Sequence, residues 1–254
     1  MSNIVLVGSG VVSIPPKRGG ATELIIFELS KYLAEKNYNV TVFDIKEREN
    51  RFSEIIKGAK YERFFVPRLG NVFFLRLSEF FFGVKCMLSA REIKPDILHA
   101  QTVFSSLPFA IFRKFCSWKF LYTSHNPAWT TEKNSLFNRI ILRIEAYVIK
   151  RSKFTITVSQ VMKDCIIKKA RVNGDKIKVI HNFVDTKKFR PTVSNWKRRM
   201  KIEGPVVLFV GKLTENKGVD VFIRCAEDLS RALPDTTFVL VGPVNFEYET
   251  ENIW

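Results

Sequence analysis

Two lysines in a short polar segment, Lys212 and Lys217, give the chain its clearest chemical signal. The segment, residues 211–220, follows the apolar run 206–210 and precedes the amphipathic stretch 219–233, which is the pattern of a strand, a loop and a helix. In an α/β sheet such a loop lies at the carboxyl end of its strand, where the next helix offers free N–H groups and a positive dipole end. Two ammonium groups added there favour a doubly charged phosphate ester or a diphosphate as the ligand. A solvated turn with two ordinary surface lysines is the alternative interpretation.

The three histidines, His99, His125 and His181, each end a predicted strand. They are therefore expected on the side of a parallel sheet that binds ligands. His125 is the strongest candidate for a catalytic residue, because Pro127 prevents a regular helix start and leaves an irregular loop from which a side chain can face a cleft. For any one of these histidines a purely structural role is the alternative.

Further polar residues lie at the same strand ends. Asn126 follows His125 directly, and Asn182 follows His181. Together with His99, these two asparagines are candidates for contacts with an acceptor or for the lining of a cleft.

Glycines mark the loop after the first predicted strand. The run Gly8-Ser9-Gly10 lacks the third glycine of a dinucleotide fingerprint, because Ser13 stands there, so NAD binding is rejected. Gly19 and Gly20 open directly into the first predicted helix, where a backbone without Cβ atoms can approach an anion closely. A loop that needs glycine only for its turn is the alternative.

Strand and helix patterns alternate along the chain. Apolar runs predict strands at residues 4–7, 40–43, 63–66, 97–100, 120–123, 154–158, 178–180, 206–210 and 237–241. Helix patterns lie at 21–36, 73–91, 107–116, 136–151, 160–170 and 219–233. Repeated βα units predict an α/β protein with a doubly wound parallel sheet.

The pattern breaks after Pro191 and restarts at Pro205. We therefore expect a Rossmann-like domain at 1–191, a linker at 192–204 and the first βαβ unit of a second Rossmann-like domain at 205–254. Fifty residues are too few for an independently stable core. The second domain is thus expected to be incomplete, as in a fragment of a longer protein, or else to pack as an appendage on the first.

Charge and composition narrow the classes of partner. Residues 1–204 carry a net charge of +20 and residues 205–254 a net charge of −4. The basic excess favours an anionic partner, and the lack of a zinc finger or RRM motif disfavours nucleic acid. Four dispersed cysteines, no signal peptide and no membrane-spanning run favour a cytoplasmic protein. The helix predicted at 136–151 has a basic rim, so peripheral contact with an anionic membrane is an alternative to packing on the sheet.

Taken in order, these pieces resemble the retaining GT-B glycosyltransferases of family 4, also called group 1, over nearly the whole chain. The segments that carry the resemblance are residues 19–23, 95–100, 123–126, 157–159, 180–185, 189–191, 210–213, 217–220 and 240–242. The resemblance implies two Rossmann-like domains with the active site in the cleft between them. A UDP- or GDP-linked sugar would bind mainly the second domain, and a glycan or lipid-linked acceptor the first.

The resemblance also implies roles for single residues. Gly20, next to Gly19, would bring its amide to the diphosphate or the transferred sugar, and His125 would hydrogen-bond near the reacting carbon. Lys217 would neutralise the departing diphosphate. Lys212 stands where the family often has arginine and keeps the charge without the bidentate fork. No metal or cofactor is implied, because basic side chains hold the phosphates.

The resemblance has one serious gap. The family's paired glutamates, which hold the donor sugar and ribose, would come later in the second domain, and the chain ends at Trp254 before them. Glu247, Glu249 and Glu251 do not have the required spacing. We therefore expect a hexosyltransferase whose 254 residues alone have little or no activity. The alternative is a non-catalytic module, left by truncation, that binds an acceptor or a membrane surface.

Overall fold

The computed structural model describes residues 1–17, 20–67, 72–130 and 135–243. The chain divides into two compact units, Met1–Val184 and Asp185–Trp254. The finer division into a domain at 1–191, a linker at 192–204 and a domain at 205–254 stays a prediction.

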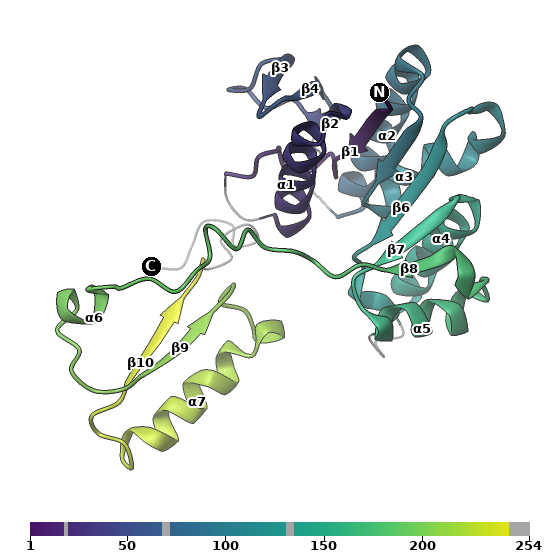
Figure 1. Ribbon diagram of the computed structural model, residues 1–254. Helices are drawn as coiled ribbons and strands as arrows, with labels where there is room; N and C mark the ends of the chain where they lie inside the picture. The colour runs from purple at the N-terminus through teal and green to yellow at the C-terminus, as the bar shows by residue number, and fades with distance from the viewer. Residues whose placement is uncertain (18–19, 68–71, 131–134, 244–254) are drawn as a thin grey trace. The chain divides into compact units, whose positions relative to one another are not determined.

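Unit 1 is built on one sheet with the strand order β3-β4-β2-β1-β5-β6-β7-β8 (Figure 1). The strands are β1 Asn3–Val7, β2 Asn39–Ile45, β3 Ser53–Ile56, β4 Ala59–Phe64, β5 Ile97–Ala100, β6 Lys119–Ser124, β7 Phe154–Thr157 and β8 Ile177–Val179. The pairs from β4 across to β8 are parallel, and β3 runs antiparallel to β4. The parallel sheet was predicted from the sequence, whereas the β3–β4 hairpin at its edge was not.

Helices cover the two faces of this sheet unequally. They are α1 Ala21–Glu35, α2 Val72–Ile93, α3 Val103–Ile111, α4 Leu136–Arg151 and α5 Gln160–Ala170. Short 3₁₀ turns lie at Arg113–Phe115, Pro127–Trp129 and Gly174–Lys176. The bounds of α4 and α5 agree with the prediction. The third helix begins at Val103 instead of residue 107, because Pro108 is tolerated inside it.

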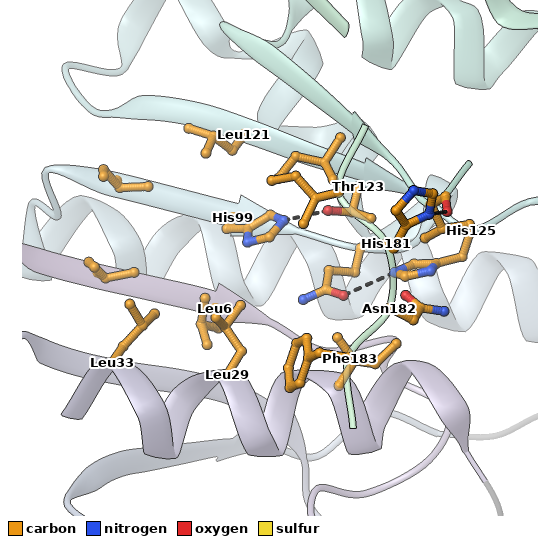
Figure 2. A pocket seen from close by; sticks show the side chains of 17 residues that line it. Leu6, Leu29, Leu33, His99, Leu121, Thr123, His125, His181, Asn182 and Phe183 are labelled. Atoms are coloured by element: carbon orange, nitrogen blue, oxygen red, sulfur yellow. Dashed lines mark hydrogen bonds between the residues drawn. The ribbon is translucent and has the colours of Figure 1, made fainter. Parts of the chain in front are cut away.

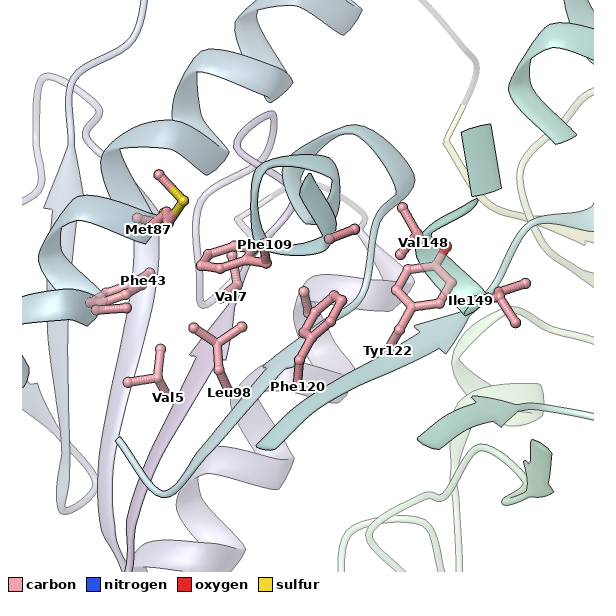
Figure 3. Packing of buried hydrophobic residues seen from close by; sticks show 14 of the residues in the cluster. Val5, Val7, Phe43, Met87, Leu98, Phe109, Phe120, Tyr122, Val148 and Ile149 are labelled. Carbon is pink, nitrogen blue, oxygen red and sulfur yellow. The ribbon is translucent and has the colours of Figure 1, made fainter. Parts of the chain in front are cut away.

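The alternation of side chains along the strands separates two cores. One face carries Val5, Val7, Leu98, Phe120 and Tyr122, which pack against buried side chains of α2 to α5 (Figure 3). The α2–α5 members of this cluster include Phe82, Met87, Phe109, Val148, Ile149, Met162 and Ile166. The opposite face carries Ile4, Leu6, Val40 and Val42, packed against Ile26 of α1. Because the β1 and β5 strands contribute to both cores, their carboxyl ends are held rigidly.

A buried ion pair fixes the loop between β1 and α1. The Asp44 carboxylate accepts a hydrogen bond from Nε of Arg63 at 2.9 Å and from the backbone N–H of Ile14 at 3.1 Å. Arg63 also donates to the Ile14 carbonyl at 3.2 Å. Burial raises the pKa of Asp44 to about 6, against the opposing effect of these hydrogen bonds. The loop that leads to Gly20 is therefore tied to β2 and β4 through charged groups.

Unit 2 contains one βαβ unit, as predicted. Parallel strands β9 Val206–Val210 and β10 Thr237–Val241 are connected through the 3₁₀ turn Glu215–Lys217 and helix α7 Val219–Ser230, and a short helix α6 Trp196–Arg199 precedes them. The helix packs on the strands through Phe222, whose ring lies 5.6 Å from that of Phe209 and 6.1 Å from that of Phe238. In the described part of the chain no helix combines the length and apolar character that crossing a membrane requires.

Replacement of Asp44 by Asn tests the loop anchor. At pH 8 the substitution removes the buried counter-charge of Arg63 and leaves its guanidinium paired with the partly exposed Glu54, so the free energy of unfolding is expected to fall by about 3 kcal/mol. Lys60→Gln removes the exposed pair with Glu62 and is the control, expected within about 0.5 kcal/mol of wild type. Urea denaturation followed by circular dichroism measures both. Equal effects of the two substitutions would contradict the anchoring role.

Candidate functional site

The candidate site lies where the strand order of unit 1 reverses. From β1 the chain passes to β2 on one side, and β5 then pairs with β1 on the other side. Ligands of doubly wound sheets bind at the carboxyl ends of strands at such a reversal. Gly8 follows β1 and Gln101 follows β5, and the hydroxyl of Ser105 at the start of α3 donates to the Gly8 carbonyl at 3.2 Å.

The three histidines line one pocket of about 260 Å³, which we call the histidine pocket (Figure 2). His99 and Thr123 face each other across β5 and β6, with 2.7 Å between Nε2 and Oγ1. Nε2 of His125 lies 3.1 Å from Oε1 of Gln101. Leucines of α1 form the facing wall. The remaining lining residues are Ile4, Leu6, Ile25, Leu29, Leu33, Ile97, Leu121, Ile156, Val158, Ile180, His181, Asn182 and Phe183.

Burial keeps the side chains of His99 and His125 neutral. The pKa of His99 is lowered to about 4, mainly by loss of hydration and further by the nearby His125. Burial also lowers the pKa of His125. At neutral pH His125 therefore presents an uncharged imidazole, which can exchange hydrogen bonds with hydroxyl groups but offers no positive charge to a phosphate.

A buried carboxylate positions the loop that carries His125. Glu145 of α4 is fully buried and accepts hydrogen bonds from Tyr122 at 2.8 Å, from Ser124 at 2.6 Å and from Nδ2 of Asn126 at 2.9 Å. Burial raises the pKa of Glu145, and these three hydrogen bonds oppose the rise. Two of the donors flank His125 in the chain, so the carboxylate fixes the turn from both sides.

A second pocket of about 230 Å³, which we call the polar pocket, shares Gln101 and His125 with the histidine pocket. Its other polar members include Arg76 and Glu79 of α2, which form an ion pair with 2.6 Å between Nη1 and Oε1. Thr22, Thr102, Val103, Phe104, Tyr122, Asn126 and Ile141 complete its lining. The two pockets thus meet at one glutamine and one histidine.

The sequence pointed to some of these residues and missed others. His99, His125 and Asn182 line the histidine pocket, and Asn126 lines the polar pocket. Gln101, Arg76 and Glu79 were not anticipated, and neither was the buried state of Glu145. At the start of α4, Leu136 is 66% exposed and Ile140 is 46% exposed, so this part of the helix is not covered by the sheet. The single acid of this basic helix was the available signal for Glu145.

Gly20 lies two residues before Thr22, which lines the polar pocket, and the two lysine candidates belong to unit 2. Gly20 caps the amino end of α1 with φ 108°, a left-handed conformation that glycine adopts most readily. Gly19 lies outside the described residues. In unit 2, Lys212 and Lys217 are exposed in the connection between β9 and α7, and Gly218 with φ 76° follows as the amino-terminal cap of α7. Among the described residues neither lysine forms an ion pair with a carboxylate.

Over the described ranges no group of three or more His, Cys, Asp and Glu side chains is arranged to hold a metal ion. That no metal or cofactor takes part remains an expectation from the sequence.

Comparison with known proteins identifies relatives of this chain. The sequence profile of Glycosyltransferase Family 4 matches residues 19–188. Spore coat protein SA of Bacillus subtilis is 23% identical over 248 residues, which are 94% of this chain and 60% of that protein. The UDP-Gal:alpha-D-GlcNAc-diphosphoundecaprenol alpha-1,3-galactosyltransferase of Escherichia coli is 25% identical over 74% of this chain and 52% of its own length. The chain therefore spans little more than half the length of these relatives.

Solved structures share the fold. Sucrose-phosphate synthase from Thermosynechococcus elongatus superposes with a TM-score of 0.76 at 16% identity, covering 98% of this chain and 64% of that one. Anabaena HepE in complex with UDP-glucose gives a TM-score of 0.67 at 21% identity, covering 97% and 62%. The predicted fold class, α/β of the GT-B type, is confirmed.

The depressed pKa of His99 makes a testable contribution to stability. Between pH 6.5 and about 4 the unfolded chain binds a proton at this residue that the folded chain excludes. His99 therefore lowers the free energy of unfolding as the pH falls through this window, by up to about 3 kcal/mol. In urea titrations at pH 7 and pH 4.5, wild type should lose stability relative to His99→Gln. A stability difference that does not change with pH would contradict the buried, neutral state of His99.

The anchoring role of Glu145 predicts a local spectroscopic change. In Glu145→Gln the amide oxygen can still accept from Tyr122 and Ser124, but the amide nitrogen cannot accept from Nδ2 of Asn126, so the free energy of unfolding should fall by about 2–3 kcal/mol. The ring signals of His125 in NMR spectra of histidine-labelled protein should move, while those of His181 stay. Glu92→Gln, at an exposed position of α2, is the control. Unchanged His125 signals in Glu145→Gln would remove the positioning role.

Proposed function

The chain belongs to Glycosyltransferase Family 4, and from this we propose that it acts in the transfer of a hexose from a nucleotide-diphosphate sugar to a glycan or lipid-linked acceptor of the cell envelope. The observation that carries the proposal is the neutral His125 in a pocket at the carboxyl ends of β5 and β6, within the span that the family profile matches. We further propose that the anomeric configuration is retained.

The proposed donor is a UDP- or GDP-linked sugar. Support comes from the structural neighbours, since HepE is described in complex with UDP and with UDP-glucose, and a trehalose-6-phosphate protein of Escherichia coli is described bound with UDP-2-fluoro glucose. In this chain Lys212 and Lys217 supply two positive charges near the amino end of α7, where a helix dipole adds to the attraction for a diphosphate.

The proposed division of labour follows the charge of each group. The bond between the anomeric carbon and the diphosphate oxygen breaks, and Lys217 stabilises the negative charge that develops on the departing diphosphate. The acceptor oxygen forms the new bond to the anomeric carbon, and its proton leaves with the diphosphate. His125, being neutral, hydrogen-bonds the transferred sugar close to the reacting carbon.

A second candidate function is that of a module that binds an acceptor or a membrane surface without catalysis. Exposed apolar side chains on α4, Leu136 at 66% and Ile140 at 46%, lie one helical turn from each other beside exposed Arg139 and Arg143. On α2, Phe73 is 68% exposed. Apolar side chains next to arginines are the pattern of a helix that lies on anionic lipid. We also propose that these 254 residues on their own have little or no transferase activity.

Substitutions in both units test the transferase. In the full-length gene product, His125→Ala and Lys217→Ala should each lower kcat for transfer of radiolabelled sugar from UDP- or GDP-sugars by about 100-fold, because each removes an interaction with the transition state. Lys187→Ala, at an exposed position outside both sites, is the matched control and should keep wild-type turnover. Full activity of both site variants would contradict the assigned roles.

The two candidate functions differ in what the 254-residue chain binds. Titration with UDP followed by calorimetry, and cosedimentation with vesicles of phosphatidylglycerol and phosphatidylcholine, measure the two ligands separately. Binding to vesicles without binding of UDP favours the module. Binding of UDP without vesicle binding favours the transferase and removes the membrane role.

A further inference from the structure

We propose that the polar pocket binds one uncharged, hydroxyl-rich ring of the acceptor, held by Arg76, Glu79 and Gln101. The inference rests on the proposed function, because it names the chemistry of the acceptor at the same site.

Two buried donors in this pocket lack a partner. Among the described residues, neither Nε2 of Gln101 nor Nε of Arg76 forms a hydrogen bond. Gln101 is only 2% exposed, and its other amide atom, Oε1, is engaged by His125. A buried N–H without a partner destabilises the protein. Ligand oxygens that accept from these two groups would remove that penalty, so the pocket suits an oxygen-bearing ligand.

The charge of the pocket favours a neutral ligand over an anion. The Arg76 guanidinium is already paired with the Glu79 carboxylate, so the pair carries no net charge when Glu79 is ionised. Burial raises the pKa of Glu79 to about 7, and Arg76 opposes this rise. A phosphate group would have to approach the Glu79 carboxylate, whereas a hydroxyl group can donate to this carboxylate and accept from the arginine.

The size and the walls of the pocket suit a single ring. Its volume of about 230 Å³ is below the roughly 300–1,000 Å³ of pockets that take drug-sized ligands. Phe104, Val103 and Ile141 supply apolar surface next to the polar groups. The guanidinium of Arg76 lies 5.5 Å from the centre of the Phe104 ring, which fixes the arginine head by a cation–π contact. A sugar ring has hydroxyl groups at its edge and apolar C–H groups on its faces, which match these two kinds of lining.

Backbone packing fixes these groups before a ligand arrives. Gly83 of α2 lies so close to α3 that a Cβ atom there would meet the Ser105 carbonyl oxygen at 2.3 Å. The close approach holds the α2 turn with Arg76 and Glu79 against the start of α3. Because Gln101 and His125 border both pockets, a ring in the polar pocket would place its hydroxyl groups next to the residue assigned to the transferred sugar.

The test uses the 254-residue chain with labelled histidines at pH 8, without any nucleotide. Methyl α-glycosides of glucose, galactose, mannose and N-acetylglucosamine are titrated, with inorganic phosphate as the competing probe. We expect at least one glycoside to shift the ring signals of His125 in a saturable way while the signals of His181 stay. Arg76→Gln and Thr22→Val should weaken this binding, the former by about tenfold, as expected for loss of a hydrogen bond to a charged group.

Arg91→Gln, at an exposed position of the same helix, is the matched control and should bind like wild type. The proposal is overturned if no glycoside moves the His125 signals, if phosphate moves them more strongly than every glycoside, or if Arg76→Gln binds like Arg91→Gln. If Arg76→Gln does not fold, glycoside binding by Thr22→Val decides the test, and binding equal to that of wild type would overturn the proposal. The experiment contains no donor, so it tests the subsite separately from catalysis. Glycoside binding by a protein without transferase activity would overturn only the proposed function. Transferase activity without glycoside binding in this pocket would overturn only the subsite.

Discussion

The geometry of the candidate site depends on one buried carboxylate, that of Glu145. A carboxyl group inside a protein is stabilised when several donors surround it, and here Tyr122, Ser124 and Asn126 do so. These donors come from the end of β6 and the turn behind it, so the cost of burying this polar group is offset only if that turn keeps its shape. The position of His125 is therefore coupled to the folding of α4 onto the sheet.

The sequence predicted the fold well because parallel α/β units depend on local patterns. Apolar runs and helical periodicity gave the βα alternation, and α4 and α5 agree with their predicted bounds. The β3–β4 hairpin escaped notice because β3 is a short edge strand with alternately half-buried and exposed residues, which leaves little apolar signal. The helix predicted at 107–116 is displaced from α3, Val103–Ile111, which contains Pro108 in its interior, a position that proline normally disfavours.

The candidate site was only partly predictable, and the reason is physical. His125 and Asn126 could be found because they follow a strand, and strand ends are visible in the sequence. Arg76 and Glu79 come from the first half of α2, where nothing local distinguishes them from surface charges. Glu79 is buried and Arg76 is partly exposed, and both lie on the helix that approaches α3 closely at Gly83, which is a tertiary property. The hydrogen bonds of Glu145 are also a tertiary property, because their donors lie about 20 residues earlier in the chain.

The electrostatics of the two units differ in a way that bears on what each can bind. In unit 1 burial lowers the pKa values of His99 and His125, and Arg76 is paired with Glu79, so its pockets offer hydrogen bonds without a strong net charge. In unit 2 Lys212 and Lys217 are exposed and, within the described residues, unpaired with carboxylates, beside the amino end of α7. A diphosphate gains most where unpaired positive charge and free N–H groups coincide, and a polyol gains most where buried donors lack partners. This difference supports the proposed division of a glycosyl transfer, in which unit 2 would bind the phosphorylated donor and unit 1 the hydroxyl-bearing acceptor.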